Sequence, residues 1–231
     1  MDVKAPGLQW YADKLNAGER FSFARYGNGE WDLVLGQGTR TGSGSQKFSP
    51  DLREAMRNTL MTRRMGNYHL AIQSTGYLKR LGLLTPAQRW LEDNAPATEW
   101  YNGEVFHKAS RRGRLRLLVK ALEERFTVVV GPPWLRRLPF ADAFILVQSK
   151  NCWQDVGAIA AQVRMHQDCV VSFSAGPAAK VLIHRLYPEM GEHSWLIDFG
   201  SVWDPYCGKK SRRYHGRMTK KIIEKNLGRR R

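Results

Sequence analysis

The segment Phe21-Ser-Phe-Ala-Arg-Tyr-Gly-Asn-Gly-Glu-Trp31 is the most informative part of this sequence. Its first residues, 21–24, form a short apolar run that is typical of a buried strand. Gly27 and Gly29 then indicate a tight turn, and residues 30–35 continue as an amphipathic run typical of a helix. The segment therefore predicts a strand, a tight turn and the start of a helix.

Three polar side chains, those of Arg25, Asn28 and Glu30, lie in this turn. In open α/β sheets ligands bind beyond the carboxyl ends of the strands, where helix N-termini present unpaired N–H groups. An arginine there can bind a phosphate through its planar fork of N–H groups, and glycines such as Gly27 and Gly29 let the backbone approach a ligand closely. The turn is therefore a candidate binding site, and an ordinary surface turn with charged residues is the alternative.

The rest of the chain alternates between strand-like and helix-like segments. Apolar runs predict strands at residues 68–73, 126–130, 143–148, 169–174 and 195–199. Helical patterns cover residues 8–18, 50–65, 76–84, 86–94, 110–122, 152–166 and 178–187. Apolar strands that alternate with helices are typical of a parallel sheet covered on both faces. We expect a doubly wound α/β fold with a mostly parallel sheet, in one domain over residues 1–208 that is followed by a basic tail, residues 209–231.

Two segments show no clear periodicity. Residues 36–45 contain four glycines, which predicts either a flexible loop that can close on a ligand or a long surface connection. Residues 98–107 are rich in aromatic and polar side chains. Trp100 and Tyr101 in this segment are candidates to stack on a base or a sugar, and packing in the core is the alternative.

The first segment resembles a known family signature. Ser22-x-x-Arg25-x-Gly27-Asn28-Gly29-Glu30 is similar to the Ser-x-x-Arg-x-Gly-Asp-Gly-Glu motif of the GT-D type glycosyltransferases, once catalogued as a domain of unknown function. Three later segments also resemble that family, in the family's order: Gln148-Ser-Lys-Asn151, Ser174-Ala-Gly-Pro-Ala-Ala-Lys180 and Ile197-Asp-Phe-Gly200. The four segments fall within residues 20–205. The resemblance implies a GT-D, Rossmann-like fold and transfer of a sugar from a nucleotide-sugar donor.

The resemblance also implies a metal ion. In that family the Asp-x-Glu pair is associated with the metal and the diphosphate of the donor, which implies a divalent cation, Mn²⁺ or Mg²⁺, at Glu30 and Asn28. This chain has Asn28 where the family has Asp. Because an amide oxygen is neutral and a weaker ligand for a hard cation, the ion would depend on Glu30, water and the donor phosphates.

Sugar transfer from a nucleotide diphosphate requires that the leaving phosphates be neutralised and the acceptor hydroxyl be deprotonated. The donor-binding residues expected from the motif and from this chemistry are Ser22, Arg25, Gly27, Asn28, Gly29, Lys150, Gly176 and Lys180. For Lys180, a solvated helix face is the alternative. The expected catalytic residues are Asp198 and Glu30. Asp198 is the first choice for the base, with Asp204, Glu104 and His193 as alternatives.

The chain is strongly basic, with a formal charge of +16 over 231 residues. Residues 209–231 hold eleven Lys or Arg and one Glu, so they carry +10 of this charge. Such clusters bind phosphate backbones through counterion release, without reading a base sequence. A solvated, partly disordered end is the alternative. The expected nucleic-acid contacts are Arg111, Arg112, Arg114, Lys209, Lys210, Arg212, Arg213 and Arg217.

The three cysteines, at positions 152, 169 and 207, are too few and too scattered for a disulfide framework or a zinc site. The N-terminus lacks an apolar signal region, and no run approaches the ~20 apolar residues of a membrane span. We therefore expect a cytoplasmic protein, which for a viral member of the family would mean the host cytoplasm.

These features together predict a nucleotide-sugar-dependent glycosyltransferase that modifies a hydroxyl on a DNA base, such as a 5-hydroxymethylpyrimidine, as in viruses that modify their genomes. A glycan or glycoprotein acceptor and a non-catalytic nucleic-acid-binding module are the alternatives. The prediction requires that the turn from Arg25 to Glu30 border a cleft. It also requires that the Arg25 guanidinium not be neutralised by an interior ion pair.

Overall fold

The computed structural model describes residues 1–41, 44, 46–62, 66–95 and 99–228. Within these residues one sheet of eight parallel strands has the order β1-β4-β3-β2-β8-β7-β5-β6. The strands are β1 (Val3–Lys4), β2 (Ser22–Tyr26), β3 (Tyr68–Ile72), β4 (Trp100–Asn102), β5 (Thr127–Gly131), β6 (Ala143–Leu146), β7 (Val170–Phe173) and β8 (Trp195–Asp198). The strand predicted at residues 21–24 is β2, and it lies inside the sheet between β3 and β8.

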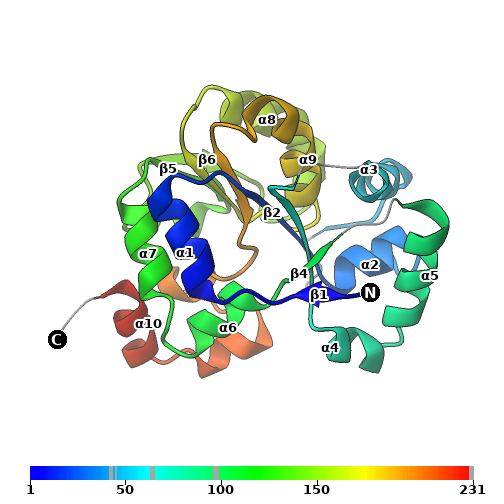
Figure 1. Cartoon of the computed structure of the whole chain (residues 1–231), viewed down its shortest axis with the longest axis horizontal. Helices are drawn as coiled ribbons and strands as arrows, with labels where there is room; N and C mark the ends of the chain where they lie inside the picture. The colour runs from blue at the N-terminus through cyan, green and yellow to red at the C-terminus, as the bar shows by residue number, and fades with distance from the viewer. Residues whose placement is uncertain (42–43, 45, 63–65, 96–98, 229–231) are drawn as a thin grey trace.

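Helices cover both faces of the sheet (Figure 1). One face carries α2 (Asn28–Val34), α3 (Pro50–Met61), α4 (Thr75–Arg80), α5 (Leu84–Asn94), α8 (Val156–Arg164) and α9 (Ala178–Met190). The other carries α1 (Leu8–Ala17), α6 (Val105–Arg111), α7 (Arg116–Glu123) and α10 (Lys220–Leu227). The expected doubly wound α/β fold is therefore confirmed.

Successive strand residues enter two separate cores. In β5, Val128 and Val130 pack under α8 and α9, whereas Val129 packs on the opposite side. In β2, Ala24 faces the first core and Phe23 the second. A strand with helices on both faces must be apolar at every position, which is why these strands stand out in the sequence as continuous apolar runs.

The strand order brings three chain segments to one edge of the sheet. Strand β2 pairs with β8 through Phe23 and Ile197, so their carboxyl ends lie side by side. The neighbouring strand β7 also ends at this edge and leads into α9. The turn after β2, the end of β8 and the first turn of α9 therefore meet.

Strands β1 and β4 were not predicted, and β4 corrects one interpretation. Trp100 and Tyr101 lie in β4 with exposed fractions of only 3% and 8%. The Trp100 ring packs edge-on against Tyr26, and the Tyr101 ring stacks on His69 with centroids 4.2 Å apart. These rings are core residues, so of the two alternatives left open by the sequence the structure selects packing in the core and excludes stacking on a base or a sugar.

Part of the predicted glycine-rich loop, residues 42, 43 and 45, lies outside the described residues, as do residues 63–65 at the end of the predicted helix 50–65. The residue that follows the loop, Gln46, is fixed in place, because it is buried and its Oε1 accepts a hydrogen bond from the backbone of Trp153. Among the helices that the structure describes, none combines the length and apolarity needed to cross a bilayer.

The described part of the predicted basic tail, residues 209–228, is folded onto the sheet domain. It forms the 3-10 helix η4 (Arg213–Arg217) and α10, which packs against α6 and α7. Asn226 is fully buried, accepts a hydrogen bond from the Leu115 backbone and donates to Ser110 O. His215 is also fully buried. This segment is therefore part of the packed structure rather than a solvated end.

Candidate active site

The turn after β2 is held by polar contacts to its own helix and to β3. The Gly27 N–H donates to Glu30 Oε2 at 2.9 Å, and the Asn28 N–H donates to Gln73 Oε1 at 3.0 Å. A Cβ atom on Gly27 would lie 3.2 Å from Glu30 Oε2 and 3.3 Å from Gln73 Oε1. A side chain at position 27 would therefore be tightly placed, and the polar groups around the turn would have to shift to make room for it.

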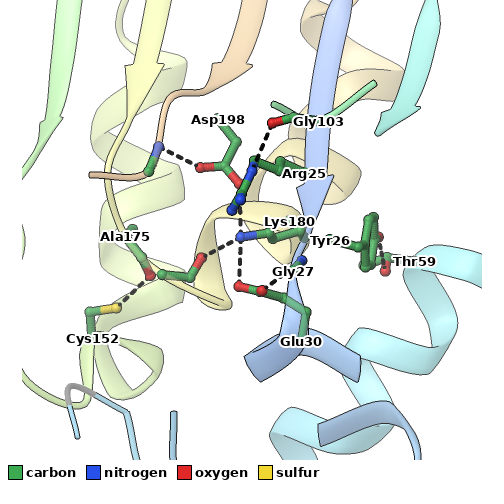
Figure 2. Close-up of polar contacts among 12 residues, drawn as sticks. Arg25, Tyr26, Gly27, Glu30, Thr59, Gly103, Cys152, Ala175, Lys180 and Asp198 are labelled. Atoms are coloured by element: carbon green, nitrogen blue, oxygen red, sulfur yellow. Dashed lines mark hydrogen bonds and ion pairs between the residues drawn. The ribbon is translucent and has the colours of Figure 1, made fainter. Parts of the chain in front are cut away.

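Lys180, in the first turn of α9, lies at the centre of the site (Figure 2). Its Nζ is 2.9 Å from Glu30 Oε1, 2.8 Å from Asp198 Oδ2 and 3.1 Å from the carbonyl oxygen of Gly176. The exposed fractions of Lys180 and Asp198 are 3% and 1%. The contacts to Glu30 and Gly176 are hydrogen bonds, and the contact to Asp198 is an ion pair. The alternative that Lys180 lies on a solvated helix face is excluded by this burial.

The three charges shift one another's proton affinities. Burial by itself lowers the pKa of Lys180, but Asp198 and Glu30 outweigh it and keep the pKa above its ordinary value. Burial raises the pKa of Glu30, and the charge of Lys180 reverses this shift, so the pKa is lowered. For Asp198 burial prevails over Lys180, and its pKa is raised. Asp198 is thus the carboxylate of the pair that binds a proton more readily.

Arg25 lies near the end of β2, and its side chain reaches the residues that follow β4. Its Nε donates to Gly103 O, and its Nη2 donates to Glu104 Oε1, both at 2.8 Å. The other Glu104 oxygen lies 3.8 Å from the Arg111 guanidinium. The side chains of Arg25 and Glu104 are 16% and 19% exposed. Arg25 is therefore held in a mostly buried ion pair, so the condition that its guanidinium be free of such a pair is not met, although Arg111 shares the same carboxylate.

A cleft of about 410 Å³ opens beside this ion pair. It lies beyond the carboxyl ends of β3 and β4 and is lined by Gln73, Ser74, Thr75, Asn102, Glu104, Lys108 and Arg111, together with Val3, Ala5 and Ile72. Gln73 and Glu104 join it to the turn after β2, since one contacts the Asn28 backbone and the other contacts Arg25. The turn borders a cleft, as the sequence-based interpretation requires.

The predicted donor-binding residues do not all meet here. Ser22 is fully buried at the amino end of β2, about 13 Å along the strand from Tyr26 at 3.3 Å per residue. This position rules out a direct contact with a ligand at the carboxyl edge. Lys150 is exposed and follows the edge strand β6, four strand spacings of about 4.8 Å from β2. Gly29 is buried against Thr41. Roles for Lys150 and Gly29 in donor binding stay predictions.

Of the three alternatives for the catalytic base, only one lies at the site. Asp204 is held by Trp134 Nε1 at 2.8 Å and by the Ser211 hydroxyl, which gives it a structural role in the C-terminal segment. His193 bonds to Ser194 Oγ and to Glu189 O at the connection that enters β8, on the opposite edge of the sheet. Glu104 lines the cleft. The carboxylates at the site are therefore Asp198, Glu30 and Glu104.

The donor set suits a divalent cation poorly. Both oxygens of Glu30 already accept from Lys180 and Gly27, and both oxygens of Asp198 contact Lys180 and the Gly200 N–H. Among the described residues, no group of three His, Cys, Asp or Glu side chains could hold a metal ion. The position between the two carboxylates is filled by an ammonium group. No step of the chemistry below is therefore assigned to a metal.

The basic residues predicted to contact nucleic acid are all exposed: Arg111, Arg112, Arg114, Lys209, Lys210, Arg212, Arg213 and Arg217. They form two groups in the sequence, residues 111–114 and residues 209–217. The fold brings the two groups together, because the Arg111 guanidinium lies over the Tyr214 ring of η4, 5.5 Å from its centroid. Tyr214 also packs edge-on against His107 of α6. The two groups thus form one surface, the α6–η4 surface, which adjoins the cleft at Arg111.

Several residues of the site were not singled out from the sequence. Gly103 accepts from Arg25, and a Cβ atom there would lie 2.7 Å from Ile72 O, so the close approach requires glycine. Gln73, Ser74 and Lys108 line the cleft. The adjacent residues Gly103 and Glu104, which follow the aromatic residues of β4, could have indicated a site at a strand end. The sequence did not reveal the short strand that precedes them.

No protein-family model matches this sequence, and a search of curated proteins gives no match either. Solved structures do match. A glycosyltransferase (DUF1792) from Streptococcus sanguinis is 19% identical, with a TM-score of 0.68 over 89% of this chain and 84% of its own. A structure of domain of unknown function 1792, described as having a distinct glycosyltransferase fold, is 17% identical with a TM-score of 0.67, covering 88% and 80%.

This chain has the DUF1792 glycosyltransferase fold. The DUF1792 fold is the one that the resemblance to GT-D glycosyltransferases implies, so that expectation is confirmed for the fold. Identities of this size establish the architecture alone. The activity of a chain with the DUF1792 fold has to be argued from its site.

Proposed function

We propose that this protein is a glycosyltransferase that uses a nucleotide-sugar donor. One observation carries the proposal: a chain with a glycosyltransferase fold has an Arg25, Glu30, Lys180 and Asp198 cluster at the carboxyl ends of its central strands, next to a cleft. In an open α/β sheet this edge is where ligands bind.

The cations around the cleft fit the diphosphate of the donor. Lys108 and Arg111 line the cleft, and Arg25 adjoins it through its ion pair with Glu104, which offsets one of the three positive charges. A net positive rim stabilises the negative charge that develops on a leaving diphosphate. Buried and fully paired, Lys180 is placed to fix Glu30 and Asp198 rather than to bind phosphate directly.

The reaction exchanges one bond for another at the sugar. The acceptor oxygen forms a bond to the anomeric carbon, the bond from that carbon to the phosphate oxygen breaks, and the diphosphate leaves with the electron pair. The acceptor proton passes to a carboxylate, for which we propose Asp198 with Glu30 as its neighbour. Burial raises the pKa of Asp198 and so favours its taking up a proton, and Glu104, the carboxylate that lines the cleft, is the alternative base.

For the acceptor we propose a hydroxyl on a modified base in DNA, of the 5-hydroxymethylpyrimidine class, and for the location the cytoplasm. The α6–η4 surface supports the acceptor, since it carries eight exposed cations and reaches the cleft at Arg111. A base in a duplex has to be flipped or single-stranded to be reached. A glycan or glycoprotein acceptor and a non-catalytic binding module are the competing functions.

Mass spectrometry of hydroxymethylated DNA after incubation with mixed nucleotide sugars tests the proposal. A gain of one sugar mass on hydroxymethylated but not on unmodified DNA is expected. Hydrolysis of a donor without transfer to DNA would retain the glycosyltransferase and reject the DNA acceptor. No turnover of any donor, with or without Mn²⁺, would favour the binding module. Arg25→Gln is the matched variant, and it should lose donor hydrolysis.

A further inference from the structure

Lys180 lies between the carboxylates of Glu30 and Asp198 and next to Glu30, the one charged residue of the expected cation site. Its Nζ is within 2.9 Å of an oxygen from each carboxylate, and it also donates to the Gly176 carbonyl. Glu30 comes from α2, Asp198 from β8 and Lys180 from α9 (Figure 2). The ammonium is thus the cation that joins three elements at the centre of the site.

The charges at the site balance without a metal. Glu30 and Asp198 carry two negative charges, and Lys180 and Arg25 carry two positive ones, before Glu104 and Arg111 are added as a further pair. Placing a doubly charged ion among these buried groups would leave it uncompensated, which is costly in a poorly solvated interior. Position 28, where an aspartate would add a negative charge, carries the neutral side chain of Asn28.

We infer that the Lys180 ammonium takes the place of a divalent cation, and that the site binds no Mn²⁺ or Mg²⁺ of its own. Lys180 acts as a positioning residue that holds Glu30 and Asp198 in place. The positive charge offered to a diphosphate comes from Lys108 and Arg111, which line the cleft. The inference concerns the same site as the proposed function, and its test uses the metal alone, so it can fail or succeed whether or not a sugar is transferred.

The first test is titration of the wild-type protein with Mn²⁺, followed by electron paramagnetic resonance of the free ion and by thermal unfolding. We expect no saturable binding at millimolar Mn²⁺ and no change in Tm. A specific site with Mn²⁺ about 100-fold above its Kd would raise Tm by roughly 5 to 10 °C for a chain of this size. Binding of one Mn²⁺ per chain that is lost in Glu30→Gln would overturn the inference.

The second test removes the ammonium. Lys180→Ala leaves two buried carboxylates without a cation, so we expect this variant to gain Mn²⁺ binding and to recover part of its lost Tm when Mn²⁺ is added. The double variant Lys180→Ala with Glu30→Gln should show no recovery, and Lys79→Ala, at an exposed lysine of α4, controls for general effects. A Lys180→Ala protein that folds and ignores Mn²⁺ would count against the inference. If it does not fold without Mn²⁺, refolding with and without the ion gives the same comparison, and the wild-type titration stands by itself.

Discussion

At the scale of single residues, Lys180 is the side chain whose loss should cost most. Replacing it with methionine keeps the length of the side chain but leaves Glu30 and Asp198 buried without their cation, for which losses of about 3–5 kcal/mol are typical. Urea unfolding of Lys180→Met measures this. The triple variant with Glu30→Gln and Asp198→Asn should recover much of the stability, whereas a loss that persists in full would mean that packing rather than charge is responsible.

The burial of His69 should make the stability of the fold depend on pH. It is 3% exposed, stacks on Tyr101, and burial lowers its pKa to about 4. Because the unfolded chain binds the proton at a pKa near 6.5, stability is complete above that pH and is lost as the pH falls from about 6.5 to about 4. The loss from this residue is on the order of 3 kcal/mol, at about 1.4 kcal/mol per pKa unit.

His69→Phe keeps an aromatic ring in the stack and removes the titrating group. Its free energy of unfolding should therefore fall less than that of the wild type between about pH 6.5 and pH 4. Chemical denaturation at a series of pH values checks this. A histidine exposed to solvent in the folded protein would not give this difference, so equal pH curves for the two proteins would contradict the burial of a neutral His69.

At the scale of elements, α10 is attached by the packing of Leu227 and Ile223 and by the hydrogen bonds of one buried side chain, Asn226. Asn226 bonds to the Leu115 N–H and the Ser110 carbonyl, at 2.8 Å each, and to the Tyr206 hydroxyl. Asn226→Ala leaves these buried groups unpaired, at about 1–3 kcal/mol for each. We expect a lower Tm and faster proteolysis within residues 209–228. Lys225→Ala, at the exposed neighbouring position, should behave like the wild type, and identical proteolysis of the two variants would contradict the anchoring role.

At the scale of the whole molecule, the charge is unevenly placed on the fold. The α6–η4 surface predicts a salt-dependent affinity for duplex DNA, and changing Arg212, Arg213 and Arg217 to Gln should reduce the slope of log Kd against log salt by about 0.9 for each DNA phosphate that is no longer neutralised. Gel shifts over a range of salt concentrations measure the slope. Changing Lys79, Arg80 and Arg89 to Gln, on α4 and α5 of the opposite layer, is the charge-matched control. Equal slopes for the two triple variants would show that the α6–η4 surface does not bind DNA.

The sequence predicted the main strands and most helices because a buried strand is apolar at every position and a helix repeats its apolar residues. It failed for β1 and β4, which have two and three residues and too little sequence to show a period. The sequence therefore left open whether Trp100 and Tyr101 line a pocket or pack in the core. The basic segment was predicted as a tail because its charges conceal the few residues, such as His215 and Asn226, that bury it.

The motif from Ser22 to Glu30 was enough by itself to predict a glycine-containing turn at the end of a strand, with Arg25 and Glu30 beside it. Only the tertiary structure separated Ser22 from that site, because a strand carries its two ends about 3.3 Å further apart with every residue. Only the tertiary structure showed that Lys180 is buried between Glu30 and Asp198 and that Arg25 shares Glu104 with Arg111. Local pattern fixes the elements through short-range sterics and burial. The Arg25–Glu104 and Lys180–Glu30 ion pairs instead join residues about 80 and 150 positions apart, so they depend on the order of the strands.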